Sequence, residues 1–427
     1  MRCLLGFLGA AAWVLCSGGL SAAQLDGKPV PIHQISAKHC KECHQDIYKQ
    51  WKGSMHAQST ALSDPIHGAF YRMVVGDPTQ EGVTKGGKYP VCLRCHAPNA
   101  ARDGTTKLDA APAYGEGVNC VACHTLGTYH GIQGPEGKMR LGTDTWTLSD
   151  ELLGANGFFH EQGEAAQRLR AEYEESGDLN PHLGRDNQGK PYMSEEDVQD
   201  LDLPLAPHPE MKTAAACLGC HDRRNNPHGV SLCQTGDEYL EGGSRETCQS
   251  CHMPVAGGVA NHAMGGGHDV AMLRRAVKLS LHAQPQGDQL QVEVVLENLQ
   301  PHNVPTGAPF RNAYLKLSAL DASGKVLWTN FQVHPAKEDP QAFLVYTMLN
   351  DRDQPAPPPK ATKPGIDTRL KPFERRTLSY HLPAEGVDSL RAELYYNLLW
   401  PALVKKLKHL PEALKQPKRM AWQELKL

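Results

Sequence analysis

Cysteine and histidine are the residues of this sequence whose types and spacing could do chemistry. Ten of its 13 cysteines form five Cys-x-x-Cys pairs, and a histidine directly follows the second cysteine of every pair. The cysteines are Cys40 and Cys43, Cys92 and Cys95, Cys120 and Cys123, Cys217 and Cys220, and Cys248 and Cys251, followed by His44, His96, His124, His221 and His252. A pentapeptide that occurs five times indicates five copies of one kind of site.

The spacing of the pentapeptide suits covalent attachment of haem. On one helical turn, residues i, i+3 and i+4 share a face, so two thiols can add to the two vinyl groups of a haem while the histidine lies over the iron. Zinc ribbons, disulfide frameworks and thioredoxin-type redox pairs also use paired cysteines. Zinc sites do not need a histidine after every second cysteine, and an exported disulfide scaffold would not repeat one pentapeptide five times. The motifs therefore predict five haems c.

The composition fits a globular protein that carries large prosthetic groups. The chain has 427 residues, more than one typical domain, and 21% of them are charged, with a formal net charge of −3. This balance argues against a disordered tail protein, and the lack of basic excess argues against nucleic acid as a partner. Aromatic residues make up only 6%, so we expect porphyrin faces to supply part of the buried apolar surface.

Residues 1–23 have the pattern of a signal peptide. Arg2 supplies a positive charge, residues 3–20 are small or apolar without charge, and residues 21–23 form a small-x-small cleavage site. Cys16 would suit a lipid anchor only if a small residue preceded it, and none does. No later stretch approaches about 18 uncharged apolar residues. The sequence therefore predicts a periplasmic or extracellular protein with no integral membrane segment in the mature chain.

The elements that must position the motifs divide the mature chain into two parts. All five motifs fall within residues 24–270, for which we predict a mostly helical domain of short helices and irregular loops packed around haems. Residues 145–202 carry no motif and are predicted to be a helical insertion. Its helix is expected from Ser149, a candidate N-cap, to Glu175, and we interpret it as a spacer.

Residues 271–427 show the two-residue alternation of half-buried antiparallel strands. Seven short strands are expected, at residues 277–282, 290–296, 313–319, 325–333, 342–348, 374–382 and 390–396. They fit a β-sandwich of immunoglobulin-like architecture, so the predicted fold class is α+β. Residues 354–364 are rich in proline and predict a loop. Residues 401–414 predict a short amphipathic helix on the sandwich, broken near Pro411.

The second axial position of each iron separates an electron carrier from a catalyst. A filled position leaves only outer-sphere electron transfer, whereas an open position lets a small substrate meet the iron. Sixteen of the 21 histidines lie outside the five motifs, so distal ligands are plentiful, although most surface histidines have no special role. His130, six residues after His124, is one candidate.

The segment after the first motif is similar to a known family. Cys40-x-x-Cys-His is followed by Trp51, Ser54 and His56, and this Trp-x-x-Ser-x-His pattern resembles the tetrahaem cytochromes that accept electrons from hydroxylamine oxidoreductase. More broadly, the stretch from Cys40 to His268 looks like the multihaem superfamily that includes that oxidoreductase and the octahaem and pentahaem reductases of nitrogen and sulfur oxyanions. The fifth motif, the insertion and the sandwich are departures from the tetrahaem pattern and leave the physiological partner open.

The resemblance implies which histidines complete the coordination of the irons. It implies that His56 ligates a neighbouring haem and that His208, nine residues before Cys217, is a distal ligand. His262 and His268 follow the fifth motif in a Gly-rich stretch, which is another feature of these proteins.

Two further residues leave more than one interpretation open. His302 begins the segment His-Asn-Val-Pro-Thr-Gly, which resembles a stretch in β-domains appended to many multihaem cytochromes, where the histidine can reach a haem iron. The same segment would also serve as a turn between strands. Cys233 is the odd cysteine of the mature chain and is either a buried small hydrophobe, a disulfide link between chains, or a redox or ligand group.

These observations favour an exported pentahaem cytochrome that transfers electrons between redox partner proteins through mostly bis-histidine haems. An oxidoreductase with one open-site haem, acting on a small nitrogen or sulfur compound, is the alternative from another class. A haem-bearing module that docks through its sandwich is a third. Catalytic residues are not identified by the sequence, because no nucleophile triad, phosphate loop or carboxylate pair stands out.

Overall fold

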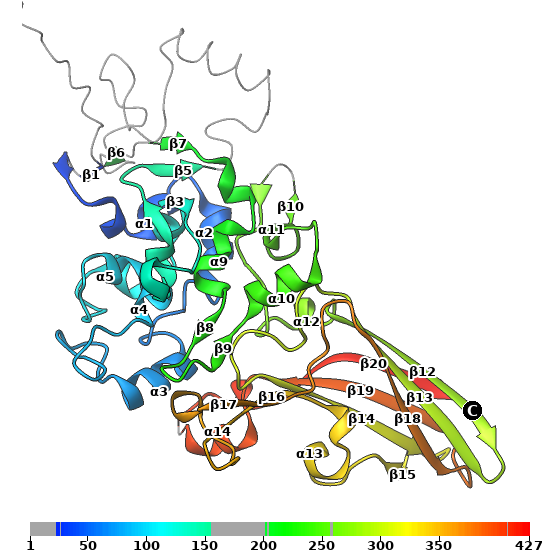
Figure 1. Cartoon of the computed structure of the whole chain (residues 1–427). Coiled ribbons are helices and arrows are strands. Elements are labelled where there is room, and N and C mark those ends of the chain that lie inside the picture. The colour runs from blue at the N-terminus through cyan, green and yellow to red at the C-terminus, as the bar shows by residue number, and fades with distance from the viewer. Residues whose placement is uncertain (1–22, 26, 155–200, 203–204, 257–258, 408) are drawn as a thin grey trace, which may run out of the picture.

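A computed structural model describes residues 23–25, 27–154, 201–202, 205–256, 259–407 and 409–427. The predicted signal peptide, apart from Ala23, lies outside these residues, as does most of the helix predicted from Ser149 to Glu175. Figure 1 shows one part made of short helices and small strands, coloured blue to green, and a second part made of long strands, coloured yellow-green to red. None of the described helices is long and apolar enough to cross a membrane.

The N-terminal part is built from short helices and small strand pairs. The helices are η1 Ile32–Gln34, α1 Ala37–Lys41, α2 Gln45–Lys52, α3 Pro65–Val74, α4 Leu93–His96, α5 Pro98–Arg102, α6 Pro112–Gly115, α7 Cys120–Cys123, η2 Pro135–Gly137, η3 Gly142–Thr145, η4 Pro209–Lys212, α9 Ala215–His221, α10 Thr235–Gly242, α11 Cys248–His252 and α12 Val270–Leu273. The strands are β1 Gln24–Leu25, β2 Lys28–Pro29, β3 Leu126–Tyr129, β4 Trp146–Leu148, β5 Leu152–Gly154, β6 Leu201–Asp202, β7 Leu205–Pro207, β8 Arg224–Asn225, β9 Ser231–Cys233, β10 Val255–Ala256 and β11 Val259–Ala260. The predicted short helices are present, but the sequence did not indicate the strand pairs between them.

Small separate clusters of apolar side chains lie beneath these helices. One contains Tyr71, Leu93 and Leu108, and another contains Ile35 and Val121. Clusters of this size bury little apolar surface compared with a single domain core, which suits a domain whose interior is shared with prosthetic groups.

The described ends of the predicted insertion are strands and not helix. β5 pairs in parallel with β7, and β6 pairs with β1. The expectation of a helix from Ser149 is therefore wrong for residues 152–154, where the backbone groups form ladder hydrogen bonds with a segment some 50 residues later. Such a long-range pairing overrides the N-cap signal of Ser149. Its side chain accepts a hydrogen bond from the Glu151 N–H at 2.9 Å, which closes a local turn that no helix follows at residues 152–154.

Two antiparallel sheets form the C-terminal part. The first has the order β12-β13-β18, and the second has the order β17-β16-β14-β19-β20, with β15 paired to β14. The strands are β12 Val277–Gln286, β13 Gln289–Asn298, β14 Asn312–Leu320, β15 Val326–Thr329, β16 Phe343–Leu349, β17 Lys363–Asp367, β18 Arg375–Pro383, β19 Ser389–Asn397 and β20 Lys418–Lys426. All seven predicted strands are present. Their alternate apolar residues, such as Val292, Leu317 and Leu394, form one buried cluster, as a period of two requires.

The C-terminal end of the chain differs from the expectation. The helix predicted at residues 401–414 is limited to α14 Pro401–Lys406, and the turn η7 Glu412–Leu414 follows Pro411. Earlier in this part of the chain lie the short helix α13 Pro335–Glu338 and the turns η5 Pro340–Ala342 and η6 Pro358–Lys360. The chain then ends in strand β20 and not in a helix. β20 lies at the edge of its sheet and alternates Lys, Arg and Glu with a few buried residues such as Met420. Charged residues on an edge strand interrupt the alternation of apolar and polar residues from which a strand is predicted.

The two parts pack closely against each other. Phe70 of α3 stacks on Phe310, which precedes β14, with ring centroids 5.3 Å apart. Asn226 Nδ2 donates to the backbone carbonyls of Pro358 and Ala361 at 2.8 and 2.7 Å. The sheets are therefore attached to the motif-bearing part by apolar and polar contacts.

Candidate haem sites

Each Cys-x-x-Cys-His motif lies on a helical turn, as its spacing predicts. The histidine N–H donates to the carbonyl of the first cysteine at 2.9 Å in the first two motifs and at 2.8 Å in the third. The fourth and fifth motifs lie within α9 and α11. Both thiols and the imidazole of a motif therefore project from one side of a helix.

A glycine in the fourth motif permits close packing of its helix. Gly219 lies between the two cysteines, and a Cβ atom built there would stand 1.9 Å from Thr145 Oγ1 and 2.1 Å from Trp146 Cη2. Only a glycine fits where the backbone of α9 meets Thr145 and Trp146, and α9 therefore lies directly against η3 and β4.

Cysteine thiols of different motifs lie close to one another. The Cys40 thiol lies beside that of Cys120, and the Cys95 thiol lies beside that of Cys220. The Cys217 thiol likewise lies beside that of Cys248. The first motif therefore neighbours the third, and the fourth lies between the second and the fifth, although these segments are far apart in the sequence.

Three motif histidines face a histidine from another segment. The ring centroids are 6.0 Å apart for His221 and His56, 6.4 Å for His124 and His262, and 6.5 Å for His252 and His302. An imidazole nitrogen binds a metal at about 2 Å, so two rings on opposite sides of one ion have nitrogens about 4 Å apart and centroids about 6 Å apart. The spacing of all three pairs fits an iron between the rings.

In five of these six rings, Nδ1 lies within hydrogen-bonding distance of another group. His124 Nδ1 lies 2.9 Å from the carbonyl of Leu153, and His252 Nδ1 lies 2.7 Å from that of Gly265. A hydrogen bond from Nδ1 leaves Nε2 as the nitrogen for a metal. The distal rings repeat the arrangement: Nδ1 lies 2.8 Å from the carbonyl of Ala260 in His262, 3.0 Å from that of Asn303 in His302, and 2.8 Å from Met264 Sδ in His56.

Burial favours the neutral form that binds metals in several of the buried imidazoles near the motifs. Burial, with the nearby His221 and other histidines, lowers the pKa of His56 to about 4. Burial and the charge of Arg224 lower the pKa of His96 to about 4. The pKa values of His124 and His302 are also lowered by burial.

The second motif has a different histidine beside it, one that the sequence reasoning missed. His67 of α3 stacks on His96 with ring centroids 4.0 Å apart and an angle of 7° between the rings. Its Nε2 is buried without a hydrogen-bond partner, and burial lowers the pKa of His67 to about 2. Rings in this face-to-face position do not lie on opposite sides of one ion. The signal that could have found His67 is its place in α3, one turn from the buried Tyr71.

The remaining predicted ligands lie in other surroundings. His130 is exposed, and its Nε2 is 2.7 Å from Thr147 Oγ1. His208 Nε2 is buried without a hydrogen-bond partner and lies 3.6 Å from a carboxylate oxygen of Glu210. His268 Nε2 is 3.5 Å from Arg311 Nη2, and burial and the charge of that arginine lower the pKa of His268 to about 4.

The first motif and Cys233 are the last of the predicted site residues to be located. Cys43 and His44 of the first motif are exposed, and His44 lies near enough to His124 to contribute to its lowered pKa. Cys233 is a free thiol at the end of β9. Burial raises the pKa of Cys233, and the nearby Cys95 of the second motif acts in the same direction.

Thiol pairs on helical turns, each followed by a histidine that in three motifs faces an imidazole from another segment, are the arrangement of a multihaem c-type cytochrome. The family described as "Cytochrome c554 and c-prime" matches residues 39–125. The chain is also similar to a penta-heme cytochrome c552 from Thermochromatium tepidum, whose crystal structure is known. The two sequences are 55% identical, the structures superpose with a TM-score of 0.85, and the match covers 93% of this chain and 100% of that one. No functionally curated protein matches the chain. The chain belongs to the multihaem c-type cytochromes, in the same family as this cytochrome c552.

Proposed function

We propose that the protein is an exported pentahaem cytochrome that transfers electrons between redox partner proteins. Each motif holds one haem c through its two cysteines and its histidine, which gives five haems. The observation that carries the proposal is the set of three histidine pairs, each formed by a motif histidine and a histidine from another segment, with ring centroids 6.0 to 6.5 Å apart. Each bound haem supplies a one-electron ferric–ferrous couple, and two imidazole ligands favour a low potential because the Met ligand that raises it is absent.

In this proposal three histidines complete the coordination of motif haems. His56 of the first segment serves the fourth motif, His262 serves the third, and His302 of the sheet part serves the fifth. A ligand from a distant segment ties the chain together at each site. The contacts between motifs 1 and 3, 2 and 4, and 4 and 5 support short distances between haems.

His130, His208 and His268 are not included in this ligand set. Their ring nitrogens lie beside Thr147, Glu210 and Arg311. The proposal includes kinship with the cytochromes associated with hydroxylamine oxidoreductase, which the family match over residues 39–125 supports. It also includes an immunoglobulin-like architecture, which the two antiparallel sheets support. Export rests on the pattern of residues 1–23 alone.

The second candidate function is an oxidoreductase with one open iron, and the second motif favours it. The face-to-face position of His67 on His96 differs from the other three pairs. An imidazole that stands beside the metal and does not bind it would leave room for a small substrate. The buried His67 Nε2 would then be available to hydrogen bond to that substrate.

Two measurements test these functions. Intact mass of the processed protein, made in a periplasm with cytochrome c maturation machinery, should show five covalent haems, and fewer would contradict the assignment of the motifs. Carbon monoxide added to the reduced protein binds only an open iron. No binding supports the carrier, whereas stoichiometric binding at one haem, lost or altered in His67→Ala, supports the oxidoreductase.

A further inference from the structure

Glu238 is a buried carboxylate that belongs to none of the motifs. It lies on α10, between the fourth and fifth motifs, and is only 3% exposed. Burying a carboxylate is costly unless it is paired and hydrogen bonded. The partners of Glu238 all come from the sheet part of the chain, so this residue joins the two parts.

Both carboxylate oxygens of Glu238 are used. Oε1 accepts a hydrogen bond from Arg369 Nη1 at 2.6 Å. Oε2 accepts one from the Asn303 N–H at 3.2 Å and another from the Thr306 hydroxyl. Asn303 and Thr306 belong to the loop that begins with His302, so one oxygen holds this loop at two points.

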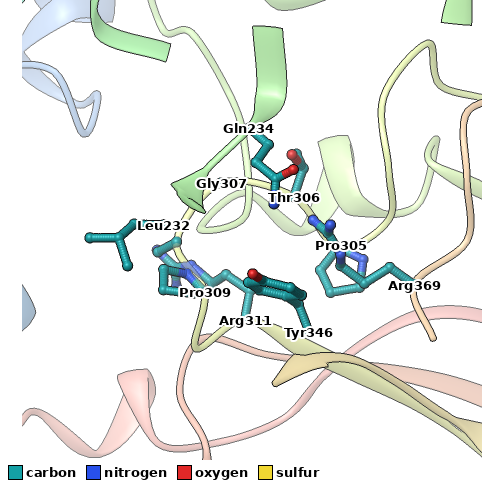
Figure 2. A pocket seen from close by; sticks show the side chains of 10 residues that line it. Leu232, Gln234, Pro305, Thr306, Gly307, Pro309, Arg311, Tyr346 and Arg369 are labelled. Carbon is teal, nitrogen blue, oxygen red and sulfur yellow. The ribbon is translucent and has the colours of Figure 1, made fainter. Parts of the chain in front are cut away.

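Arg369 is anchored independently of Glu238. Its Nε and Nη2 donate to Asp367 at 2.9 and 2.8 Å, and its guanidinium lies 5.2 Å from the ring centroid of Tyr346. Figure 2 shows Thr306, Tyr346 and Arg369 around the small hollow at this junction. The arginine thus offers the carboxylate a fixed cation from the sheet.

The same loop fixes the ring of His302. Its Nδ1 lies 3.0 Å from the Asn303 carbonyl, and its own carbonyl accepts from Asn298 Nδ2 at 2.8 Å. The N–H of Asn303 is the group that Glu238 holds. We propose that Glu238, with Arg369, is a positioning residue that holds His302 opposite His252. This inference rests on the proposed function, in which His302 ligates the fifth haem.

Removing the carboxylate should release the loop. Glu238→Ala leaves the Asn303 N–H, the Thr306 hydroxyl and Arg369 Nη1 without their acceptor, and each unsatisfied buried donor is unfavourable. The loop then relaxes, and the His302 imidazole leaves the axial position. Glu238→Gln keeps one oxygen as an acceptor but loses the charge, so it should have a smaller effect. Glu393→Gln is a matched control, because Glu393 lies on β19 and pairs with Arg419 of the neighbouring strand at 2.8 Å.

The test is electron paramagnetic resonance of the oxidised full-length protein with five haems. His302→Ala should convert one iron from low spin to high spin. Glu238→Ala should give the same high-spin signal, the double variant should show no second high-spin iron, and Glu393→Gln should match wild type.

Two results separate the possible failures. A high-spin iron in His302→Ala but none in Glu238→Ala overturns the positioning role and leaves the ligand assignment intact. All irons low-spin in His302→Ala overturns the ligand assignment itself. If Glu238→Ala attaches fewer than five haems, Glu238→Gln decides: a shifted midpoint potential at one haem supports the inference, and a wild-type redox titration overturns it.

Discussion

Replacing His56 by alanine should change the haem of the fourth motif and not that of the first, although His56 follows the first motif in the sequence. The ring of His56 lies 6.0 Å from that of His221, which belongs to the fourth motif. The backbone at His56 is held independently of its side chain, because its carbonyl accepts from the Val118 N–H at 2.9 Å. The substitution should therefore remove a ligand without moving the chain.

The size of the effect follows from the number of haems and from ligand chemistry. One iron of five, a fifth of the total, should become high-spin. Axial ligands set haem potentials over about 0.8 V, and a tenfold preference for ferric over ferrous iron corresponds to about 59 mV for one electron. If the His56 imidazole binds ferric iron more tightly than ferrous iron by two to three factors of ten, its loss raises the midpoint potential of that haem by about 100–200 mV.

The assay is optical and magnetic resonance spectroscopy combined with a redox titration. The alanine leaves a buried space shaped for a ring, so added imidazole should bind there and restore the low-spin spectrum. His130→Ala is the control, since His130 is exposed and hydrogen bonded to Thr147. A His56→Ala protein whose spectrum and titration match wild type would refute the assignment of His56 as a ligand.

Three further predictions concern packing and charge. Gly219→Ala should lower attachment of the fourth haem, because its Cβ would overlap Trp146, and intact mass would show chains with four haems. Leu317→Ala should lower the free energy of unfolding by about 2–5 kcal/mol, because Leu317 is fully buried between the sheets, and denaturant unfolding would measure the loss. Burial alone raises the pKa of Asp367, but hydrogen bonds and charge from Arg369 outweigh burial, so the pKa is lowered. The ionised Asp367 carboxylate stabilises the folded state at pH values above its unfolded pKa of about 3.9, and this contribution is lost as the pH falls through the lowered folded pKa. Asp367→Asn should therefore weaken the dependence of the free energy of unfolding on pH below about pH 4.

Neighbouring substitutions serve as controls for the packing predictions. Leu218→Ala changes the other intervening residue of the fourth motif and should leave five haems attached. Lys316→Ala lies on the opposite face of β14 from Leu317 and should cost little. Four-haem chains in Leu218→Ala as often as in Gly219→Ala would contradict the close-packing explanation, and equal losses at residues 316 and 317 would contradict the position of the core.

Local patterns in the sequence were sufficient to predict the motif turns and seven strands. The Cys-x-x-Cys-His spacing fixes a helical turn within five residues, and the alternation of residues such as Val292 and Leu317 fixes the face of each strand. Strand β20 was missed because its edge position places charged residues along it. Strand β5 was missed because its partner β7 is distant in the sequence.

Which histidine faces which motif depends on long-range packing, and a single sequence does not reveal it. The resemblance pointed to His56, His262 and His302, but their partners in the fourth, third and fifth motifs follow from the fold. His67 was missed because it belongs to no recognisable pattern of its own, unlike His56 and His302. Only the packing of α3 brings it to His96.

Quantitative electron paramagnetic resonance of the oxidised five-haem protein tests the central claim most directly, because it counts low-spin and high-spin irons. With His262, His56 and His302 as ligands at the third, fourth and fifth motifs, at least three of the five irons should be low-spin with the signals of two imidazole ligands. Fewer than three such irons would contradict the proposed ligation.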